Sequence, residues 1–264
     1  MLGPGRAQIW RYAPAHRRPR HFHSEPELNL IVAGSGIFGA GEAVLRVSAG
    51  DLLCWPPGQD HELIEASPDF DLFVAGLTPE LSERVLGKDS RAALAGPSRL
   101  RLAPSALARF RSMCAVPLPG QSPSAAEAHV AEFWREAHAL RLRAGVPHAL
   151  GPRALSSLLE RPELGRNAVA LLSRADPSEV SRHFHQHTGV TLTRYRTRLR
   201  LLGFIQKVDA GRGTLLAAAL DAGFGSYSQC HRAFLRTLGC TPRAFFGTDL
   251  RRHIEDAVSP WSPG

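Results

Sequence analysis

Three histidines and one glutamate are the residues of this sequence best suited to chemistry. His21, His23 and Glu27 lie within seven residues of one another, and His61 follows a Pro56-Pro57-Gly58 turn. Imidazole nitrogens combined with one carboxylate suit a first-row transition metal. If residues 21–23 form a strand, His21 and His23 point to the same face, because side chains alternate along a strand. These residue types are therefore candidate metal ligands.

Two other interpretations of the same four side chains remain open. Clustered histidines can hydrogen-bond a small effector in a pocket that contains no metal. They can also have a purely structural role in the core of a domain. If a metal binds, then zinc, iron, manganese and nickel are all compatible with the ligand set.

Residues 9 to about 77, which contain the four candidate ligands, have the pattern of a β-domain. Apolar runs are separated by Gly, Pro and Asp at Leu28–Ala33, Val44–Val47, Leu52–Trp55 and Leu72–Leu77. Such runs predict short strands. Gly34-Ser-Gly36 and Gly39-Ala-Gly41 are expected to form hairpin turns. Short strands at regular spacing predict a barrel or a sandwich.

The spacing of the motifs in this region resembles the cupin family. The matching residues are His21-Phe-His23-Ser-Glu25-Pro-Glu27 with Gly34, and Gly50-Asp51 with Pro56-Pro57-Gly58 and His61. The resemblance implies a cupin β-barrel with a divalent metal held by the three histidines and Glu27. Glu65 stands where the family pattern ends in Asn.

Helices are expected after the β-region. A helix capped by Thr78 should begin at Pro79, and further helices are expected near 89–95, 104–114 and 125–144. The helix at 125–144 carries an apolar face made of Val130, Phe133, Trp134, Ala137 and Leu140. This face either packs on the barrel of its own chain or forms a dimer contact, and spacing leaves both open.

Positive charge is concentrated in the second half of the chain. Residues 1–151 contain 16 Lys+Arg and 15 Asp+Glu, whereas residues 152–252 contain 16 and 7. The two regions thus carry net charges of +1 and +9, and the last twelve residues carry −2. A basic domain attracts a polyanion. The charge distribution indicates a nucleic acid as the partner of the second half.

The stretch from Leu215 to Phe246 has the pattern of a helix-turn-helix. A short helix at 215–222 runs into a turn at Gly223, and Ser226 with Gln229 forms a capping box that begins the next helix. The residues at the buried spacing are Cys230, Ala233, Phe234 and Leu238. The outward residues near the helix start are Tyr227, Ser228, His231 and Arg232. Polar and cationic groups at this place suit reading of the DNA major groove.

A first copy of this motif lies at residues 166–189. The first helix is expected to bury Ala168, Leu171 and Leu172. Asp176 should cap a second helix at 177–187, with Val180, Phe184 and His187 facing inward. Its outward residues are Ser178, Ser181, Arg182 and His185. Arg182 and Arg232 are the expected base readers, because Arg binds guanine O6 and N7 bidentately.

One longer helix, from Leu192 to about Ala210, should join the two motifs. At ~1.5 Å per residue its length is roughly 27 Å, of the order of one DNA turn of about 34 Å. Two reading helices held in this way could enter successive major grooves. The helix carries Arg194, Arg196, Arg198 and Arg200, which are either a solvated face or partly phosphate contacts.

The second half resembles the AraC/XylS family of bacterial transcription regulators over about residues 155–248. The matching positions are Ala217-Ala-Ala-Leu-Asp-Ala-Gly-Phe, Ser226, Arg232-Ala-Phe, Gly239 and Thr241-Pro242. The resemblance implies two recognition helices, 177–187 and 226–238, held by the linker helix.

Together these features predict an α+β chain with two domains: a cupin-like sensing and dimerisation domain at 1–148, and a double helix-turn-helix domain at 152–250. The expected function is a transcription regulator in which a small-molecule or metal effector changes the affinity for double-stranded promoter DNA. A homodimer is expected, with RNA polymerase as a further partner.

A metal-dependent cupin enzyme (an oxygenase or isomerase) with a helical appendage is the alternative, and a barrel that only dimerises is a third. The cysteines Cys54, Cys114, Cys230 and Cys240 are far apart and indicate neither a disulfide framework nor a zinc finger. No apolar run suggests a signal segment or membrane span, so a cytoplasmic setting is expected.

Overall fold

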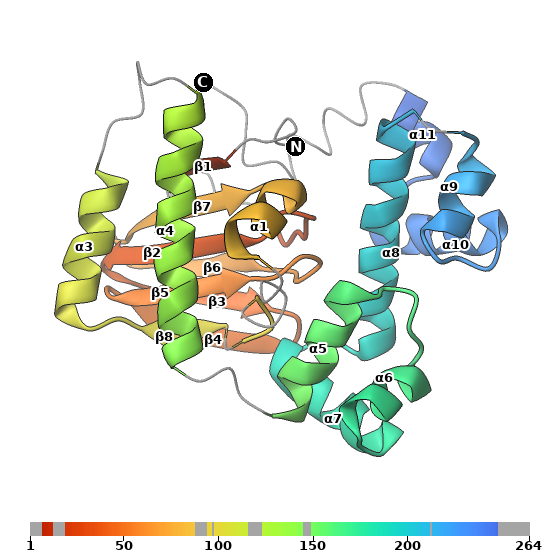
Figure 1. Cartoon of the computed structure of the whole chain (residues 1–264), viewed down its shortest axis with the longest axis horizontal. Helices are drawn as coiled ribbons and strands as arrows, with labels where there is room; N and C mark the ends of the chain where they lie inside the picture. Colours follow the sequence, from red (N-terminus) through yellow and green to blue (C-terminus); the bar gives the residue numbers. More distant parts are fainter. Residues whose placement is uncertain are drawn as a thin grey trace.

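The computed structural model describes residues 7–12, 19–87, 94–96, 98–115, 123–144, 149–211 and 213–247. Two sheets at the N-terminal end are followed by helices that cover them, and then by a helical region (Figure 1). The chain is therefore α+β, as the sequence predicts. None of the described helices is long and apolar enough to cross a membrane.

Two antiparallel sheets form the N-terminal barrel. The larger has the order β1-β7-β2-β5-β8 and consists of β1 (Ala7–Tyr12), β2 (Glu27–Ala33), β5 (Asp51–Trp55), β7 (Asp71–Leu77) and β8 (Arg99–Arg101). The smaller has the order β4-β3-β6 and consists of β3 (Ser35–Ala40), β4 (Ala43–Ser48) and β6 (Glu62–Ala66). Every apolar run that predicted a strand lies in one.

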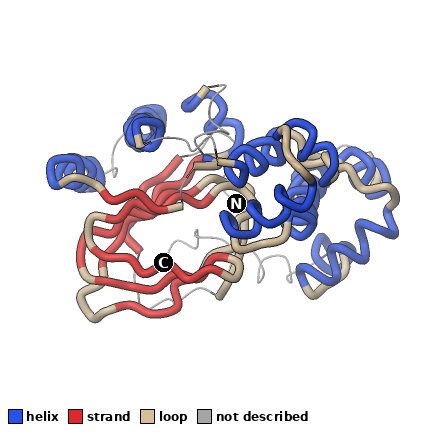
Figure 2. The backbone as a smooth tube through the Cα atoms, turned by 90° about the horizontal axis from the view of Figure 1, so that it is seen from below, coloured by secondary structure: helices blue, strands red, loops and turns tan. Residues whose placement is uncertain are grey.

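Both faces of the larger sheet are covered, which explains its continuous apolar runs. On the inside, Leu53 and Trp55 pack with Phe38 of the smaller sheet. On the outside, Leu28 and Cys54 pack with three helices: α1 (Pro79–Leu86), α3 (Pro104–Cys114) and α4 (Pro123–Arg143). Figure 2 shows the two layers of strands, with helices along the outside of one layer and the C-terminal helices at one end.

The apolar face of α4 packs within its own chain. Val130, Phe133, Trp134 and Ala137 are all buried in the same cluster as the outer face of the larger sheet. Of the two roles that the spacing left open, the structure supports packing on the barrel. Leu140 is partly buried against this cluster.

The predicted hairpin turns are only partly correct. Gly34 and Gly41 lie in turns and have positive φ angles of +67° and +58°, whereas Gly36 and Gly39 lie inside β3. The glycines within β3 are explained by crowding, because a Cβ on Gly36 would come within 3.0 Å of the Phe70 ring. The expected helix at 89–95 lies mostly outside the described residues, as does the segment 145–148 between the domains.

The C-terminal helices form two clusters that share the helix α8 (Leu192–Asp209). In the first, α5 (Leu150–Glu160), α6 (Arg166–Ser173) and α7 (Pro177–Thr188) pack on the start of α8. In the second, α9 (Leu215–Asp221), α10 (Tyr227–Leu238) and α11 (Pro242–Gly247) pack on its later part. Because α5 packs with α6 and α7, it joins the helical region; the exact domain boundaries stay a prediction.

The helix starts follow the sequence closely, but one buried face was wrong. Ser226 Oγ accepts from Gln229 N, and Gln229 Oε1 accepts in return from Gly225 N. In α6, however, the predicted core residues Leu171 and Leu172 are 80% and 47% exposed. The buried residues are instead Val169, Ala170 and Ser173, because α5 and α7 contact the adjacent face of α6.

Candidate functional site

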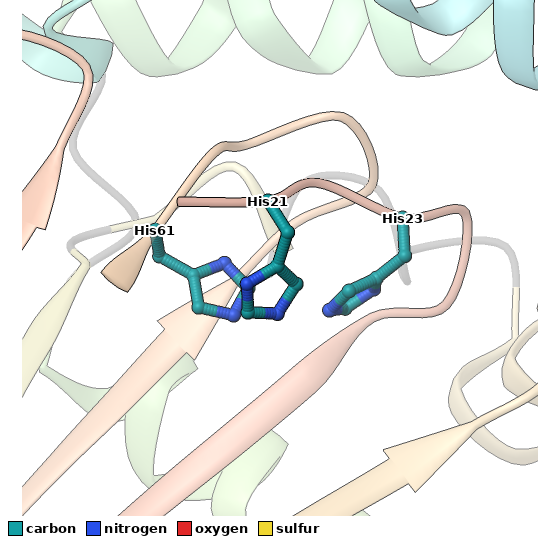
Figure 3. A group of neighbouring side chains, drawn as sticks. All are labelled: His21, His23 and His61. Carbon is teal, nitrogen blue, oxygen red and sulfur yellow. The ribbon is translucent and has the colours of Figure 1, made fainter. Parts of the chain in front are cut away.

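The three histidines come from two segments that meet at one end of the barrel. His21 and His61 form an isolated antiparallel bridge, with His21 N donating to His61 O at 3.2 Å and His61 N donating to His21 O at 3.0 Å. His23 follows in the same segment as His21, and Glu27 begins β2. The expectation that His21 and His23 lie in one regular strand was wrong, because this segment makes a single bridge. The rings nevertheless point toward one another (Figure 3).

All four predicted ligands lie close together. One side-chain nitrogen of each histidine lies within 4.8 Å of one nitrogen of each of the others. Glu27 Oε2 is 3.3 Å from His23 Nε2, and Glu27 Oε1 is 3.6 Å from His61 Nε2. The carboxylate therefore closes the cluster against two of the three rings.

The backbone fixes the orientation of each ring. Nδ1 of each histidine contacts a main-chain carbonyl oxygen: His21 with Pro19 at 2.9 Å, His23 with Glu25 at 2.7 Å, and His61 with Gln59 at 3.2 Å. A carbonyl oxygen can only accept, so each Nδ1 must carry the proton of the bond. In a neutral ring, Nε2 then has a free electron pair that can bind a metal. A carbonyl contact at the other ring nitrogen is the arrangement that orients histidine ligands in metal sites.

The charges of the cluster are set by burial and by Glu27. Burial and the neighbouring His61 and His23 lower the pKa of His21 to about 3, so this ring is neutral at neutral pH. Burial would lower the pKa of His23 too, but the Glu27 carboxylate beside its Nε2 raises it. Burial would raise the pKa of Glu27, yet the adjacent His23 and His61 rings hold it well below its usual value.

A divalent metal fits this donor set. His23 Nε2 is buried without a well-formed hydrogen bond, although Glu27 is close. Three neutral-capable imidazoles with one carboxylate match zinc, iron, manganese or nickel.

A polar chain inside the barrel holds the carboxylate in place. Asn29 Nδ2 donates to Glu27 Oε1 at 2.7 Å, and Trp55 Nε1 donates to Asn29 Oδ1 at 2.6 Å. Sequence reasoning missed both supporting residues. The alternation of Glu27 and Asn29 in one strand was the available signal, since residues two apart share a face.

A small cavity of about 40 Å³ adjoins the cluster inside the barrel. Its lining residues are Trp10, Tyr12, His21, Glu27, Asn29, Phe38, His61, Glu62, Leu63, Leu72 and Val74. Apolar walls with a few polar groups at one side are typical of a small-molecule site. The histidine cluster provides the polar side.

The segment that ends in His61 is also bonded to α8. Tyr195 Oη donates to Pro57 O at 2.7 Å, and Arg198 Nη1 donates to Asp60 Oδ1 at 2.7 Å. Gln59 Nε2 reaches Thr188 O of α7 at 3.0 Å. The residues that carry His61 therefore hold the helix that joins the two helix-turn-helix units.

Arg198 contacts both of the segments that carry the histidines. Its guanidinium lies 5.2 Å from the centroid of the Phe22 ring, and Arg20 Nη1 shares Asp60 at 3.3 Å through Oδ2. Burial would raise the pKa of Asp60, but hydrogen bonds and charge from Arg198 and Arg20 lower it. This contact set was not foreseen, because nothing in the local sequence pairs residues that lie so far apart along the chain.

The expected DNA-reading residues lie on α7 and α10. Arg182, Ser178, Arg232 and Ser228 are exposed, and Ser181, Tyr227 and His231 are partly exposed. Two of the serines are already bonded locally: Ser178 Oγ donates to Asp176 Oδ1 and Ser181 Oγ donates to Pro177 O. Arg182 and Arg232 are therefore the strongest candidates for base contact.

His185, also predicted to read DNA, faces the barrel instead. Its Nε2 is 3.2 Å from Glu42 Oε2 in the β3–β4 turn, and Glu42 N donates to Gly189 O at 2.8 Å just after α7. The barrel thus contacts the C-terminal end of α7. Outward spacing could not reveal this, because the occluding surface comes from the other domain.

The arginine run of α8 is mostly used inside the chain. Arg196 bonds Leu164 O, Arg200 bonds Pro162 O and Glu163 O, and Arg198 is buried against Asp60. Arg194 is exposed. Of the four arginines in this run, Arg194 therefore remains the candidate for a phosphate contact.

Comparison with known structures gives low similarity. ToxT from Vibrio cholerae is 11% identical, with 91% of this chain and 97% of that chain covered at a TM-score of 0.43. A point mutant of oxalate decarboxylase OxdC from Bacillus subtilis is 21% identical over 28% of this chain and 21% of that chain, at a TM-score of 0.24. Pac13, a nucleoside dehydratase from Streptomyces, is 17% identical over 29% and 62%, at a TM-score of 0.25. No curated protein sequence matches the chain.

Two family models match the chain, and together they cover most of it. The AraC-like ligand binding domain matches residues 4–133, which hold the barrel and the histidine cluster. The helix-turn-helix domain matches residues 170–248, which hold α7, α8 and α10. The chain therefore belongs to the AraC/XylS family of transcription regulators, with an N-terminal ligand-sensing domain and a C-terminal DNA-binding domain.

Proposed function

We propose that this regulator responds to a divalent metal ion, alone or with a small molecule bound in the adjoining cavity, and that the response reaches DNA through α8. One observation carries the proposal: the segment Pro57–His61 supplies a candidate ligand at one end and bonds Tyr195 and Arg198 along its length. The sensing cluster and the linker helix thus share one short segment.

His21, His23, Glu27 and His61 would hold the metal ion. A bound ion would supply a positive charge beside Glu27, whose pKa is lowered, and beside His23, whose pKa is raised. His23 gives up its proton to become a ligand, because only the neutral ring has a free nitrogen pair. Any shift of His21 or His61 moves a segment that contacts Arg198 through Phe22 or Asp60.

The helical region would read promoter DNA with α7 and α10 in successive major grooves. Exposed Arg182 and Arg232 are the proposed base readers, and Arg194 a phosphate contact. The proposal includes a homodimer and contact with RNA polymerase at the promoter. The dimer must use a surface other than the buried face of α4.

A metal-dependent enzyme is the second candidate, because the complete three-histidine, one-glutamate set beside an apolar cavity also suits catalysis. The bonds from the His61 segment to α8 favour sensing, since catalysis alone does not require them. Turnover of a small acid or thiol by metal-loaded protein, without any effect of metal on DNA binding, would favour the enzyme.

The decisive experiment measures DNA affinity by fluorescence anisotropy on a fragment selected from a random library. We expect zinc or manganese to change the dissociation constant of the wild type at least ~5-fold, which is a typical coupling between two sites. His61→Ala should abolish this response. His129→Gln is the matched control, because His129 bonds Met113 O on α3, away from the cluster. An unchanged metal response in His61→Ala would refute the proposed site.

A further inference from the structure

A second cavity lies between the barrel and the helical region. Its volume is about 220 Å³, and it is open to solvent on one side. Its lining residues are Ser24, Pro26, Pro57, Pro79, Ser82, Glu83, Leu94, Leu159, Pro162, Leu199, Leu202, Gly203 and Gln206. The walls thus come from the two histidine-bearing segments, from α1, from the end of α5 and from α8. Figure 1 shows α8 upright beside the barrel, with α1 at the barrel edge nearest to it.

Gly203 is the unusual residue in this wall. It lies inside α8, where glycine is less favourable than alanine. Its φ is not positive, so the backbone does not require glycine. A Cβ built on Gly203 would meet nothing within 4 Å, so no packed neighbour requires it either. What glycine provides here is open space on the cavity side of the helix, as where a ligand approaches a backbone closely.

We propose that this interdomain cavity binds an uncharged, largely apolar small molecule. Four leucines and four prolines make up most of the described lining, and Ser24, Ser82 and Gln206 offer hydrogen-bonding groups. The described lining residues include no Lys, Arg or His, while Glu83 adds a carboxylate. A carboxylate or phosphate ligand would therefore find no cationic side chain among the described lining residues to offset the cost of leaving water, which disfavours it.

The site differs from the histidine cluster in both place and chemistry. The cavity beside the cluster is lined by residues of the barrel, whereas this one is bounded largely by α1, the end of α5 and α8. Pro57 lines the interdomain cavity, and Pro57 O also accepts the Tyr195 hydroxyl. An occupant would therefore touch the junction between sensor and linker helix directly, without passing through the barrel.

The test uses the neutral fluorescent dye N-phenyl-1-naphthylamine with the full chain. We expect saturable binding to the wild type, with rising fluorescence as the dye leaves water. Gly203→Leu fills the cavity from α8 and should weaken binding at least ~10-fold. Gly203→Ala is the matched control: it adds one methyl group, should retain binding within ~3-fold, and should not lower the unfolding temperature because alanine favours the helix.

A second variant guards against misfolding of the first. Gln206 is exposed at the cavity, so Gln206→Phe should block entry while tolerating the larger side chain. Loss of dye binding in Gly203→Leu and Gln206→Phe, with retention in Gly203→Ala, supports the site. Equal binding in all four proteins places the dye elsewhere and overturns the proposal, as does absence of binding to the wild type. Tighter binding of the anionic dye cis-parinaric acid than of the neutral dye would overturn the proposed ligand class.

Discussion

Arg198 of α8 and Asp60 of the barrel form an ion pair across the two halves of the chain, with Nη1 and Oδ1 2.7 Å apart. Their side chains are only 5% and 4% exposed. Removing one partner of a buried pair leaves the other charge uncompensated, which typically costs ~3–5 kcal/mol. The pair is therefore a strong constraint on how the sensor holds the linker helix.

We expect Arg198→Met to lower the free energy of unfolding by about 3 kcal/mol in urea titrations. Asp60→Asn should have a similar effect. The double variant should lose less than the sum of the two, because it leaves no unpaired charge. Arg194→Met, on the exposed side of the same helix, is the control and should change stability little. Strict additivity in the double variant would show that the pair contributes no coupling.

Arg182→Ala and Arg232→Ala should each weaken binding to the selected DNA by about 1–3 kcal/mol, if each reads a guanine. The loss should be greatest on the preferred sequence and smaller on random DNA, since a base contact carries specificity. Anisotropy titrations at several salt concentrations measure both. Arg84→Ala, on α1 outside the helix-turn-helix domain, is the control. An unchanged affinity and salt slope in the double variant would exclude these two residues as readers.

Zinc should stabilise the folded protein if the histidine cluster binds it. At a free metal concentration of about 100 times the dissociation constant, the expected gain is about 2.7 kcal/mol. Thermal unfolding with zinc and then with chelator measures this gain. His23→Ala should remove it, whereas His129→Gln should keep it. A gain of equal size in His23→Ala would place the metal outside the cluster.

Gly41→Ala should loosen the contact between the barrel and α7. A Cβ on Gly41 would lie 2.3 Å from Gly189 O, and its φ of +58° disfavours other residues. The β3–β4 turn must then move away, which separates Glu42 from His185. We expect faster proteolysis between the domains and tighter DNA binding, because the acidic side chain leaves the reading helix. Gly87→Ala controls for a positive-φ glycine with no close neighbour; equal effects from both would make strain alone responsible.

Acid should weaken the packing of α7 through His187. Burial lowers the pKa of this histidine below 6.5, although its Nε2 contact with Ala95 O acts in the opposite direction; nearby Arg141 lowers it further. The unfolded chain therefore takes up a proton before the folded chain does. Stability is complete above about pH 6.5 and falls as the pH drops toward the folded pKa. Urea unfolding on either side of this range, at about pH 7.5 and about pH 5.5, tests this, and His187→Gln should show a smaller decrease than the wild type.

Local features of the fold could be predicted from the sequence, because local interactions decide them. The caps at Thr78, Asp176 and Ser226 each accept the bond that their spacing predicts. The four-residue cluster was also found, since its members lie in short, recognisable motifs. The burial of Leu171 and Leu172 was predicted wrongly, because both fit the apolar spacing of an isolated helix and only tertiary contacts select the face.

Contacts between the domains could not be predicted. Arg198 stands in a run of four alternating arginines, and like exposed Arg194 it follows a threonine and precedes a large side chain. Only the fold shows that one faces Asp60 and the other solvent. His185 likewise has the spacing of a residue that contacts DNA. It contacts Glu42 instead, in the β3–β4 turn, which lies far earlier in the chain.

Gly41 of the barrel and Gly189 at the end of α7 lie against each other and limit how this regulator could be engineered. A Cβ on Gly41 would lie 2.3 Å from Gly189 O, and a Cβ on Gly189 would lie 2.5 Å from Ala40 O, so neither position accepts a side chain unless the other domain moves. A biosensor made by grafting this sensor onto a different reading domain would need a glycine equivalent to Gly189. It would also need a tyrosine and an arginine equivalent to Tyr195 and Arg198. We expect a fusion that joins the two domains through the connecting segment alone, without these contacts, to keep the binding properties of each domain. We expect it to lose the coupling between them.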